Sequence, residues 1–353
     1  MQYDTLIRQA LIMDGRNTPG YVADVGLRDG RIEAIGDLSA ALAEQAIDAR
    51  GRVLAPGFID VHTHDDTVVI RQPQMLPKLS QGVTTVIVGN CGISASPVRL
   101  RGEPPDPMNL LGRREAFTYP RFADYRAAVE SAHPAVNVAA LIGHTALRSN
   151  HMDDLHRSAT PDEIAAMRVQ LRDSLEDGAL GLSTGLAYAS AFNAETDEVL
   201  QLSEELTAYG AVYTTHLRSE FEPVLEAMDE AFLIGRHAQV PVIISHLKCA
   251  GAGNWGRSPQ LLAALEQAAK THPVGCDCYP YAASSSTLDL KQVTDAFRIT
   301  ITWSTPHPEM GGRDLQAIAA EWDVSLMDAA RRLQPAGAVY YGMDEADVRR
   351  ILA

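Results

Sequence analysis

Residues 53–64 read VLAPGFIDVHTH, a short apolar run that ends in two histidines, and this stretch decides the fold. His62 and His64 lie two positions apart, so their side chains point the same way in an extended strand. Six later runs share this form, an apolar segment followed by a polar end. They are VTTVIVGNCG (83–92), NVAALIGH (137–144), ALGLSTG (179–185), VYTTHLRS (212–219), PVIISHLK (241–248) and PVGCDCYPY (273–281).

Helical segments are predicted between these runs. Residues 160–178 open with Thr160 as an N-cap, followed by Pro161 and Glu163, and residues 193–210 end at a glycine. Strands that alternate with helices indicate a parallel sheet with crossover helices. Polar residues at the end of each strand favour a (β/α)8 TIM barrel, because an open doubly wound sheet would more often carry a Gly-rich phosphate loop after its first strand.

The barrel predicted in this way lacks one strand. We expect residues 1–55 to form a small β-sandwich-like domain, incomplete without strands from the C-terminal side, and residues 56–280 to supply barrel strands one to seven. Residues 281–345 are interpreted as an inserted lid, a long polar loop with two helices. Residues 346–353 are interpreted as the last helix before strand eight, for which the sequence contains no candidate.

Composition excludes several classes of protein. A formal net charge of −15 argues against a nucleic-acid partner, whose phosphates require a basic face. No apolar run reaches the roughly 20 residues that span a bilayer, and residues 1–15 do not resemble a secretory signal. We therefore expect a cytoplasmic protein with no membrane partner.

A metal site is predicted at the strand ends. His216 and His246 follow the fifth and sixth strands, and Cys91 follows the second. A barrel rim gathers such positions, and imidazole and thiolate are the ligands that Zn²⁺ prefers. A single histidine at a strand end, such as His144 after the third strand, is more often structural. For Cys91 the alternative is a small apolar filler in GNCG, but the surrounding histidines favour a metal ligand.

The motifs also resemble a known family. PGFIDVHTH is similar to the first-strand signature of the amidohydrolase superfamily. Further segments along the whole chain resemble its D-aminoacylase (N-acyl-D-amino-acid deacylase) branch: GNCGISASP (89–97), GLSTGLAYASAFNAETDE (181–198), SHLKCAGAGNWGRS (245–258), CDCYPYAASSSTL (276–288) and WSTPHPEMGGRDL (303–315). This resemblance implies zinc-dependent hydrolysis of a small N-acyl-D-amino acid to a carboxylate and a free D-amino acid.

The resemblance also implies roles for individual residues. The tightly held zinc is expected on Cys91, His216 and His246, and a second, weaker position on His62 and His64, with the thiolate in place of an anionic bridge. Lys248 is expected to hold the substrate carboxylate, although a solvated rim lysine is the alternative. Further pocket residues are expected, although aromatic residues in a barrel are often core: Tyr188, Tyr279, Tyr340 and Ser284.

The family's general base is an aspartate after strand eight, and this chain contains no match to it. Asp277 is placed before the end of strand seven, and Asp65 follows the histidine pair too closely. Hydrolysis by this chain is therefore expected to be slow. Two alternatives remain: a cyclic amide hydrolase of the same superfamily, which usually keeps a bridging lysine, and a non-catalytic zinc-binding protein.

Overall fold

A computed structural model describes residues 2–353, and the chain divides into two compact units. The smaller unit comprises Met1–Ile59 with Ser80–Thr84, and the larger comprises Asp60–Leu79 with Thr85–Ala353. The change of unit after Ile59 comes a few residues later than the boundary that we placed at residue 55.

The smaller unit is built on a β-sheet of order β3–β2–β1–β4, with β5 paired to β1. Its strands are β1 (Gln2–Ile12), β2 (Tyr21–Arg28), β3 (Arg31–Gly36), β4 (Leu42–Asp48) and β5 (Val53–Leu54). β1 and β2 pair antiparallel with a register shift between Ile7 and Ala10, and both strands contribute residues to one core. That core contains Ala10, Ile12, Val25 and Ala49.

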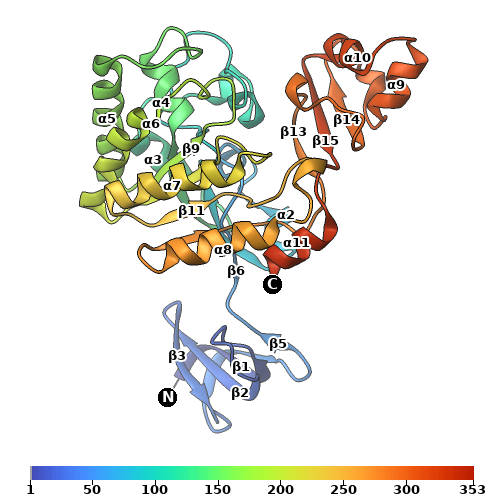
Figure 1. Ribbon diagram of the computed structural model, residues 1–353. Coiled ribbons are helices and arrows are strands. Elements are labelled where there is room, and N and C mark those ends of the chain that lie inside the picture. Colours follow the sequence, from blue (N-terminus) through green and yellow to red (C-terminus); the bar gives the residue numbers. More distant parts are fainter. Residues whose placement is uncertain (1) are drawn as a thin grey trace. The chain divides into compact units, whose positions relative to one another are not determined.

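A curved seven-stranded sheet, most of whose residues belong to the larger unit, follows the order of the sequence from β6 at one edge to β12 at the other (Figure 1). Its strands are β6 (Phe58–Asp60), β7 (Val83–Val88), β8 (Asn137–Gly143), β9 (Gly181–Gly185), β10 (Val212–His216), β11 (Val242–Ile244) and β12 (Val274–Cys276). The pairings from β7 to β12 are all parallel. This is the strand arrangement of a (β/α) barrel, and the seven strands are the seven that the sequence predicts.

Helices connect successive strands and pack against one another around the sheet (Figure 1). They are α1 (Val68–Arg71), α2 (Leu76–Leu79), α3 (Phe122–Ala132), α4 (His144–His151), α5 (Pro161–Glu176), α6 (Thr196–Ser203), α7 (Val224–Ala238) and α8 (Ser258–Ala269). The predicted N-cap of α5 is confirmed, because Thr160 and Glu163 form a complete capping box. The segment after α6 continues as a 3₁₀ turn and ends at Gly210, whose φ is 59°.

The segment predicted as a polar loop with two helices contains more regular structure than expected. The two helices are present as α9 (Leu315–Glu321) and α10 (Leu326–Leu333), but an antiparallel sheet of order β13–β15–β14 accompanies them (Figure 1). Its strands are β13 (Ser284–Thr287), β14 (Ile299–Ser304) and β15 (Ala336–Tyr340). This small layer of sheet and helices has its own apolar core, which includes Ile301, Ile318, Leu333 and Ala338.

The last helix is α11 (Glu345–Leu352), which packs against α8. Asp344 caps it by accepting hydrogen bonds from the backbone of Ala346 and Asp347. None of the helices within residues 2–353 is long and apolar enough to cross a bilayer.

Candidate metal centre

The register of the large sheet brings the ends of three strands to one edge. Thr215 of β10 pairs with Ile244 of β11, and Ile244 pairs with Cys276 of β12. Barrel enzymes place their chemistry at this carboxyl edge. The functional side chains that end or follow these strands are His216, His246 and Asp277.

Cys91 lies at the centre of two groups of possible metal ligands. One group joins it to His216 and His246, the other to His62 and His64, and within each group the ligand atoms all lie within 4.8 Å of one another. The Cys91 Sγ is 3.1 Å from Nε2 of His62 and 3.4 Å from Nε2 of His246. The structure thus brings together all five side chains that the sequence analysis nominated as ligands.

A tight backbone turn holds Cys91 in this position. Cys91 is buried and has a φ of 55°, a left-handed conformation that costs free energy for a residue with a Cβ. The next residue, Gly92, also has a positive φ, and a Cβ there would lie 2.6 Å from the backbone nitrogen of Gly185. A glycine at position 92 therefore lets the loop after β7 pack directly on β9.

Two carboxylates hold the outer nitrogens of the histidines. Nδ1 of His62 is 3.1 Å from Oδ2 of Asp277, and Nδ1 of His246 is 2.8 Å from Oε1 of Glu220. Nε2 of each imidazole faces Cys91. A carboxylate that accepts a hydrogen bond from one ring nitrogen fixes the proton of the neutral ring on that nitrogen, so the other nitrogen is the one that can bind a metal.

Tyr188 supports the third imidazole. Its hydroxyl lies 3.3 Å from Nδ1 of His216, and the two rings are 4.7 Å apart between centroids. From the family resemblance, we expected Tyr188 to line the substrate pocket. The structure places it at the metal cluster, where its hydroxyl contacts a nominated ligand.

The cluster favours ionisation of the thiol. Burial by itself raises the pKa of Cys91, but the neighbouring imidazoles of His62 and His246 outweigh burial and hold that pKa well below its usual range. In return, despite burial, Cys91 and Asp277 raise the pKa of His62 to about 10. A thiolate among imidazoles is a donor set suited to Zn²⁺.

One ring nitrogen of the cluster makes no hydrogen bond within the described residues. Nδ1 of His64 is buried and has no hydrogen-bond partner in the part of the chain that the structure describes. A buried polar atom without a partner is costly, and a bound ion at the Cys91 group would change the environment of this ring. The orphaned nitrogen and the thiolate together fit a metal centre.

Lys248 lies beside this centre and is buried. Its Nζ donates to Oε1 of Glu220 and lies 5.6 Å from the centroid of the Tyr279 ring. The charge of Lys248 also helps, against the effect of burial, to hold the pKa of Glu220 well below its usual range. Because Lys248 is buried and paired with Glu220, it is not a freely solvated lysine at the barrel rim. The Tyr279 ring lies beside its ammonium group.

Tyr340 and Ser284 lie together on the three-stranded sheet, where they are paired in register. The hydroxyl of Tyr340 accepts a hydrogen bond from the backbone of Asp289 at 2.8 Å and donates to the carbonyl of Thr287 at 3.0 Å. Both polar capacities of Tyr340 are thus used within this sheet. Its contact with substrate, and that of Ser284, stays a prediction.

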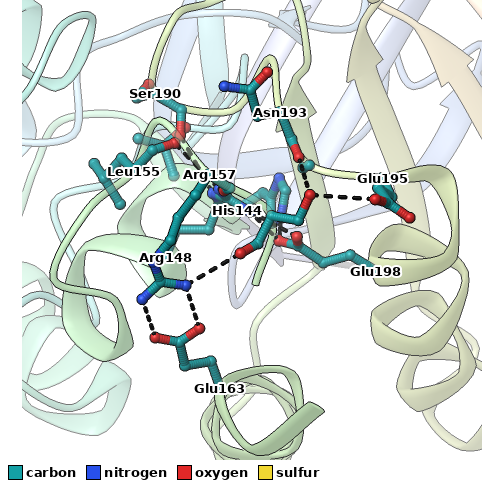
Figure 2. A network of polar contacts seen from close by, with 12 residues as sticks. His144, Arg148, Leu155, Arg157, Glu163, Ser190, Asn193, Glu195 and Glu198 are labelled. Atoms are coloured by element: carbon teal, nitrogen blue, oxygen red, sulfur yellow. Dashed lines mark hydrogen bonds and ion pairs between the residues drawn. The ribbon is translucent and has the colours of Figure 1, made fainter. Parts of the chain in front are cut away.

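His144 belongs to a different network, which Figure 2 shows. Its Nε2 lies 2.7 Å from Oε1 of Glu198, and Nη1 of Arg148 lies 2.6 Å from the same oxygen. All three side chains are buried, and burial lowers the pKa of His144. Nη2 of Arg148 also donates to the carbonyls of Leu155 and Arg157. This network joins α4, α6 and the loop before α5, and His144 contributes to neither ligand group.

The acids near the histidine pair are occupied. Asp65 accepts a hydrogen bond from Thr63 and pairs with Lys78 at 3.1 Å. Asp66 is buried, which raises its pKa to about 6, and it accepts a hydrogen bond from the backbone of Ala95. Asp65 and one oxygen of Asp66 are thus held by the loop after β6, whereas Oδ2 of Asp66 is buried and has no hydrogen-bond partner among the described residues.

The sequence also matches the model of a known protein family, over most of its length. Residues 45–352 match the model described as the amidohydrolase family. The chain belongs to the amidohydrolase family. This match covers the metal cluster, the seven-stranded sheet and the three-stranded sheet.

Characterised relatives resemble this amidohydrolase over nearly its whole length. A D-aminoacylase of Alcaligenes xylosoxydans xylosoxydans is 48% identical over 99% of this chain and 72% of its own. A solved D-aminoacylase superposes with a TM-score of 0.96 at 48% identity, over 99% of this chain and 74% of its own. An N-acyl-D-glutamate deacylase from Bordetella bronchiseptica, solved with zinc and a phosphonate inhibitor that mimics the tetrahedral intermediate, superposes with a TM-score of 0.95 at 43% identity, over 100% and 74%.

Sequence reasoning missed two carboxylates of this amidohydrolase. Glu220 was not considered, although it lies four residues after His216, in the segment TTHLRSE (214–220). Asp277 was placed before the end of its strand, but β12 ends at Cys276, so Asp277 begins the loop at the edge where the histidines gather. Its position directly after an apolar strand was the signal that could have identified it.

Proposed function

We propose that this amidohydrolase hydrolyses the amide bond of N-acyl-D-amino acids and releases a carboxylate and a free D-amino acid. The observation that carries the proposal is the juxtaposition of a cysteine-centred ligand cluster with the buried cation of Lys248. A cation beside a metal-type site suits a substrate that carries a carboxylate next to the scissile amide. The names of the relatives support the same substrate class.

The metal that we assign is zinc, with one tight position on Cys91, His216 and His246. A second, weaker position uses His62 and His64 with the shared thiolate. Three protein ligands of nitrogen and sulfur are the usual set of a catalytic zinc site. When bound, zinc supplies polarisation of the amide carbonyl and a lower pKa of a bound water.

The protein's own side chains position the substrate in this proposal. Lys248 pairs with Glu220, and its Nζ also lies 2.7 Å from Nδ1 of His246, so the ammonium is already oriented and has a further N–H group for a substrate carboxylate. The Tyr279 ring beside it adds an apolar wall. A fixed carboxylate contact on one side and the cluster on the other define two points of attachment for the substrate.

Proton transfer is the step for which the described residues, 2–353, provide no uncommitted carboxylate at the cluster. Among the carboxylates described at the cluster, Asp277 accepts hydrogen bonds from His246 and contacts His62, and Glu220 contacts His246 and Lys248. A positioned general base contributes about 10²- to 10⁴-fold in rate. Binding of zinc and of substrate does not need this base, so both can be measured separately from hydrolysis.

The test combines metal analysis, binding and hydrolysis. The zinc-loaded protein is titrated with N-acetyl-D-methionine and N-acetyl-L-methionine by calorimetry, and release of the free amino acid is followed over long incubation. We expect tighter binding of the D-enantiomer, and D-specific hydrolysis that a chelator abolishes and zinc restores. Equal binding of both enantiomers would reject the proposal.

The same experiment separates the two alternatives. A cyclic amide hydrolase would open dihydrouracil or a hydantoin faster than it cleaves the linear amide. A non-catalytic zinc-binding protein would hold zinc and bind neither enantiomer. N-acetyl-D-glutamate and N-acetyl-D-aspartate, assayed beside the methionine derivative, determine which side chain is preferred.

A further inference from the structure

Asp277 contacts both histidine groups of the cluster through its two carboxylate oxygens. Oδ2 lies 3.1 Å from Nδ1 of His62, which follows the first barrel strand. Oδ1 accepts a hydrogen bond of 2.7 Å from the backbone N–H of His246, which follows the sixth. One side chain after strand seven thus joins a nominated ligand of the weaker position to one of the tighter position.

The backbone around Asp277 makes this connection rigid. Its N–H donates to the carbonyl of Ile244 at 3.0 Å, and its carbonyl accepts from the N–H of Leu247 at 2.9 Å. The Asp277 side chain is mostly buried, with 10% of its surface exposed. The loops after β11 and β12 are therefore tied together on both sides of His246.

The backbone of His246 needs such support. Its φ is 39°, in the left-handed region that residues with a Cβ rarely adopt. Conformations of this kind persist only where surrounding contacts hold them. The hydrogen bond from the His246 N–H to Asp277 is a contact of this type, because it fixes the peptide that precedes the strained residue.

We propose that Asp277 is a positioning residue that couples the two metal positions, fixing the backbone of His246 for one and the ring nitrogen of His62 for the other. The inference rests on the metal assignment made under the proposed function. Asp277 keeps the proton of His62 on Nδ1 and so leaves Nε2, which faces Cys91, free to bind an ion.

Asparagine at position 277 separates the two roles. Its single carbonyl oxygen can still accept from the His246 N–H, which is only a donor. The amide NH₂ then faces Nδ1 of His62, and this nitrogen can accept only if the proton moves to Nε2. A protonated Nε2 cannot bind a metal. Asp277→Asn should therefore weaken the second position and spare the first.

The experiment titrates metal-free protein with zinc and resolves the affinities of the first and second equivalents. For Asp277→Asn we expect the second equivalent to bind about 10- to 100-fold more weakly, with the first changed by no more than a few-fold. His62→Ala should weaken the second equivalent too, and adding Asp277→Asn to it should cause no further loss. A further loss in the double variant would overturn the proposal.

Asp24→Asn is the matched control. Asp24 is also a buried aspartate that accepts from the N–H of a residue with positive φ, Gln9, but it lies in the smaller unit. This variant should lose thermal stability without changing either zinc affinity. If it weakened the second equivalent as much as Asp277→Asn does, the effect would be one of general destabilisation and the proposal would be wrong.

A measurement on the unaltered protein covers the case in which the variant does not fold. Long-range ¹H–¹⁵N correlation spectra of the protein loaded with two zinc equivalents should show the His62 proton on Nδ1, with His62→Ala used for assignment. A proton on Nε2 would overturn the proposal. Failure of zinc to bind at all would overturn the metal assignment and this inference with it, whereas normal binding with an unaffected second equivalent in Asp277→Asn would overturn this inference alone.

Discussion

Oε1 of Glu220 lies 2.8 Å from Nδ1 of His246 and also accepts a hydrogen bond from Nζ of Lys248. A single carboxylate oxygen therefore connects a nominated zinc ligand to the nominated substrate cation. Burial opposes its ionisation, but Lys248, His216 and His246 together keep the pKa of Glu220 well below its usual range. Glu220 is therefore expected to be negatively charged at neutral pH.

Glu220→Gln should weaken zinc binding. The amide can still accept from His246, but it has no charge to balance the ring and Lys248, and changes of this kind typically reduce metal affinity by about 10- to 100-fold. Competition with a chromophoric chelator measures the change. Glu230→Gln is the control, because Glu230 is also partly buried and paired, with Arg218, outside the ligand groups; equal losses in both variants would contradict the role given to Glu220.

Cys91→Ala should remove the tightly bound zinc. The thiolate is shared by both ligand groups, so its loss leaves only two ligands in each. Elemental analysis after dialysis should find zinc in the unaltered protein and little in the variant. Cys249→Ala serves as the control, since that buried thiol has a pKa raised to about 12 by burial and lies in neither group. Full zinc content in Cys91→Ala would refute the assignment.

Lys248→Met should weaken binding of N-acetyl-D-methionine without removing zinc. Loss of a hydrogen bond between charged groups corresponds to about 10- to 100-fold in affinity. Calorimetry should show this loss for the acid, and no comparable loss for N-acetyl-D-methioninamide, which lacks the carboxylate. Lys270→Met, at an exposed helix end, should bind both ligands normally. An equal effect of Lys248→Met on acid and amide would exclude carboxylate recognition.

The strands and the ligand cluster were predictable because both depend on periodic features of the sequence. Apolar runs with polar ends mark parallel strands, and the carboxyl ends of such strands meet at one edge of the sheet. Cys91 and His216 could therefore be assigned to one metal site, although they lie 125 positions apart in the sequence (216 − 91). The resemblance to a family then supplied roles that spacing alone did not.

The partners of the histidines were not predictable in the same way. Asp277 reaches His246 because the backbone of His246 takes a left-handed turn, which no apolar pattern reports. The strand Ser284–Thr287 was missed because it is short and polar, so it has no alternation of apolar and polar residues. Ile299–Ser304 does contain alternating apolar residues, and a closer reading of ITITWS would have identified that strand.

The last prediction concerns the acid stability of the larger unit. Both carboxylate oxygens of Glu163 contact Arg157, at 2.6 and 2.8 Å, at the start of α5. The hydrogen bonds from Arg157 are the largest influence on this carboxyl, and they lower its pKa to about 2 from an ordinary 4.5. Because the folded-state pKa is the lower one, the stabilisation is complete above about pH 4.5 and is lost as the pH falls towards 2.

Glu163→Gln should therefore reduce the free energy of unfolding by about 1 kcal/mol at pH 7, the upper range for a partly exposed ion pair. Glutamine keeps the capping-box hydrogen bond to the backbone of Thr160, so the loss reports on the charge and one hydrogen bond of the pair with Arg157 and not on the cap. Urea unfolding of both proteins at pH 7, 5, 4 and 3 should show the difference shrinking below about pH 4.5. Glu345→Gln, which breaks the exposed pair with Arg349 on α11, should change stability by less than about 0.5 kcal/mol at pH 7. A difference for Glu163→Gln that stayed constant down to pH 3 would mean that the ion pair does not carry the effect.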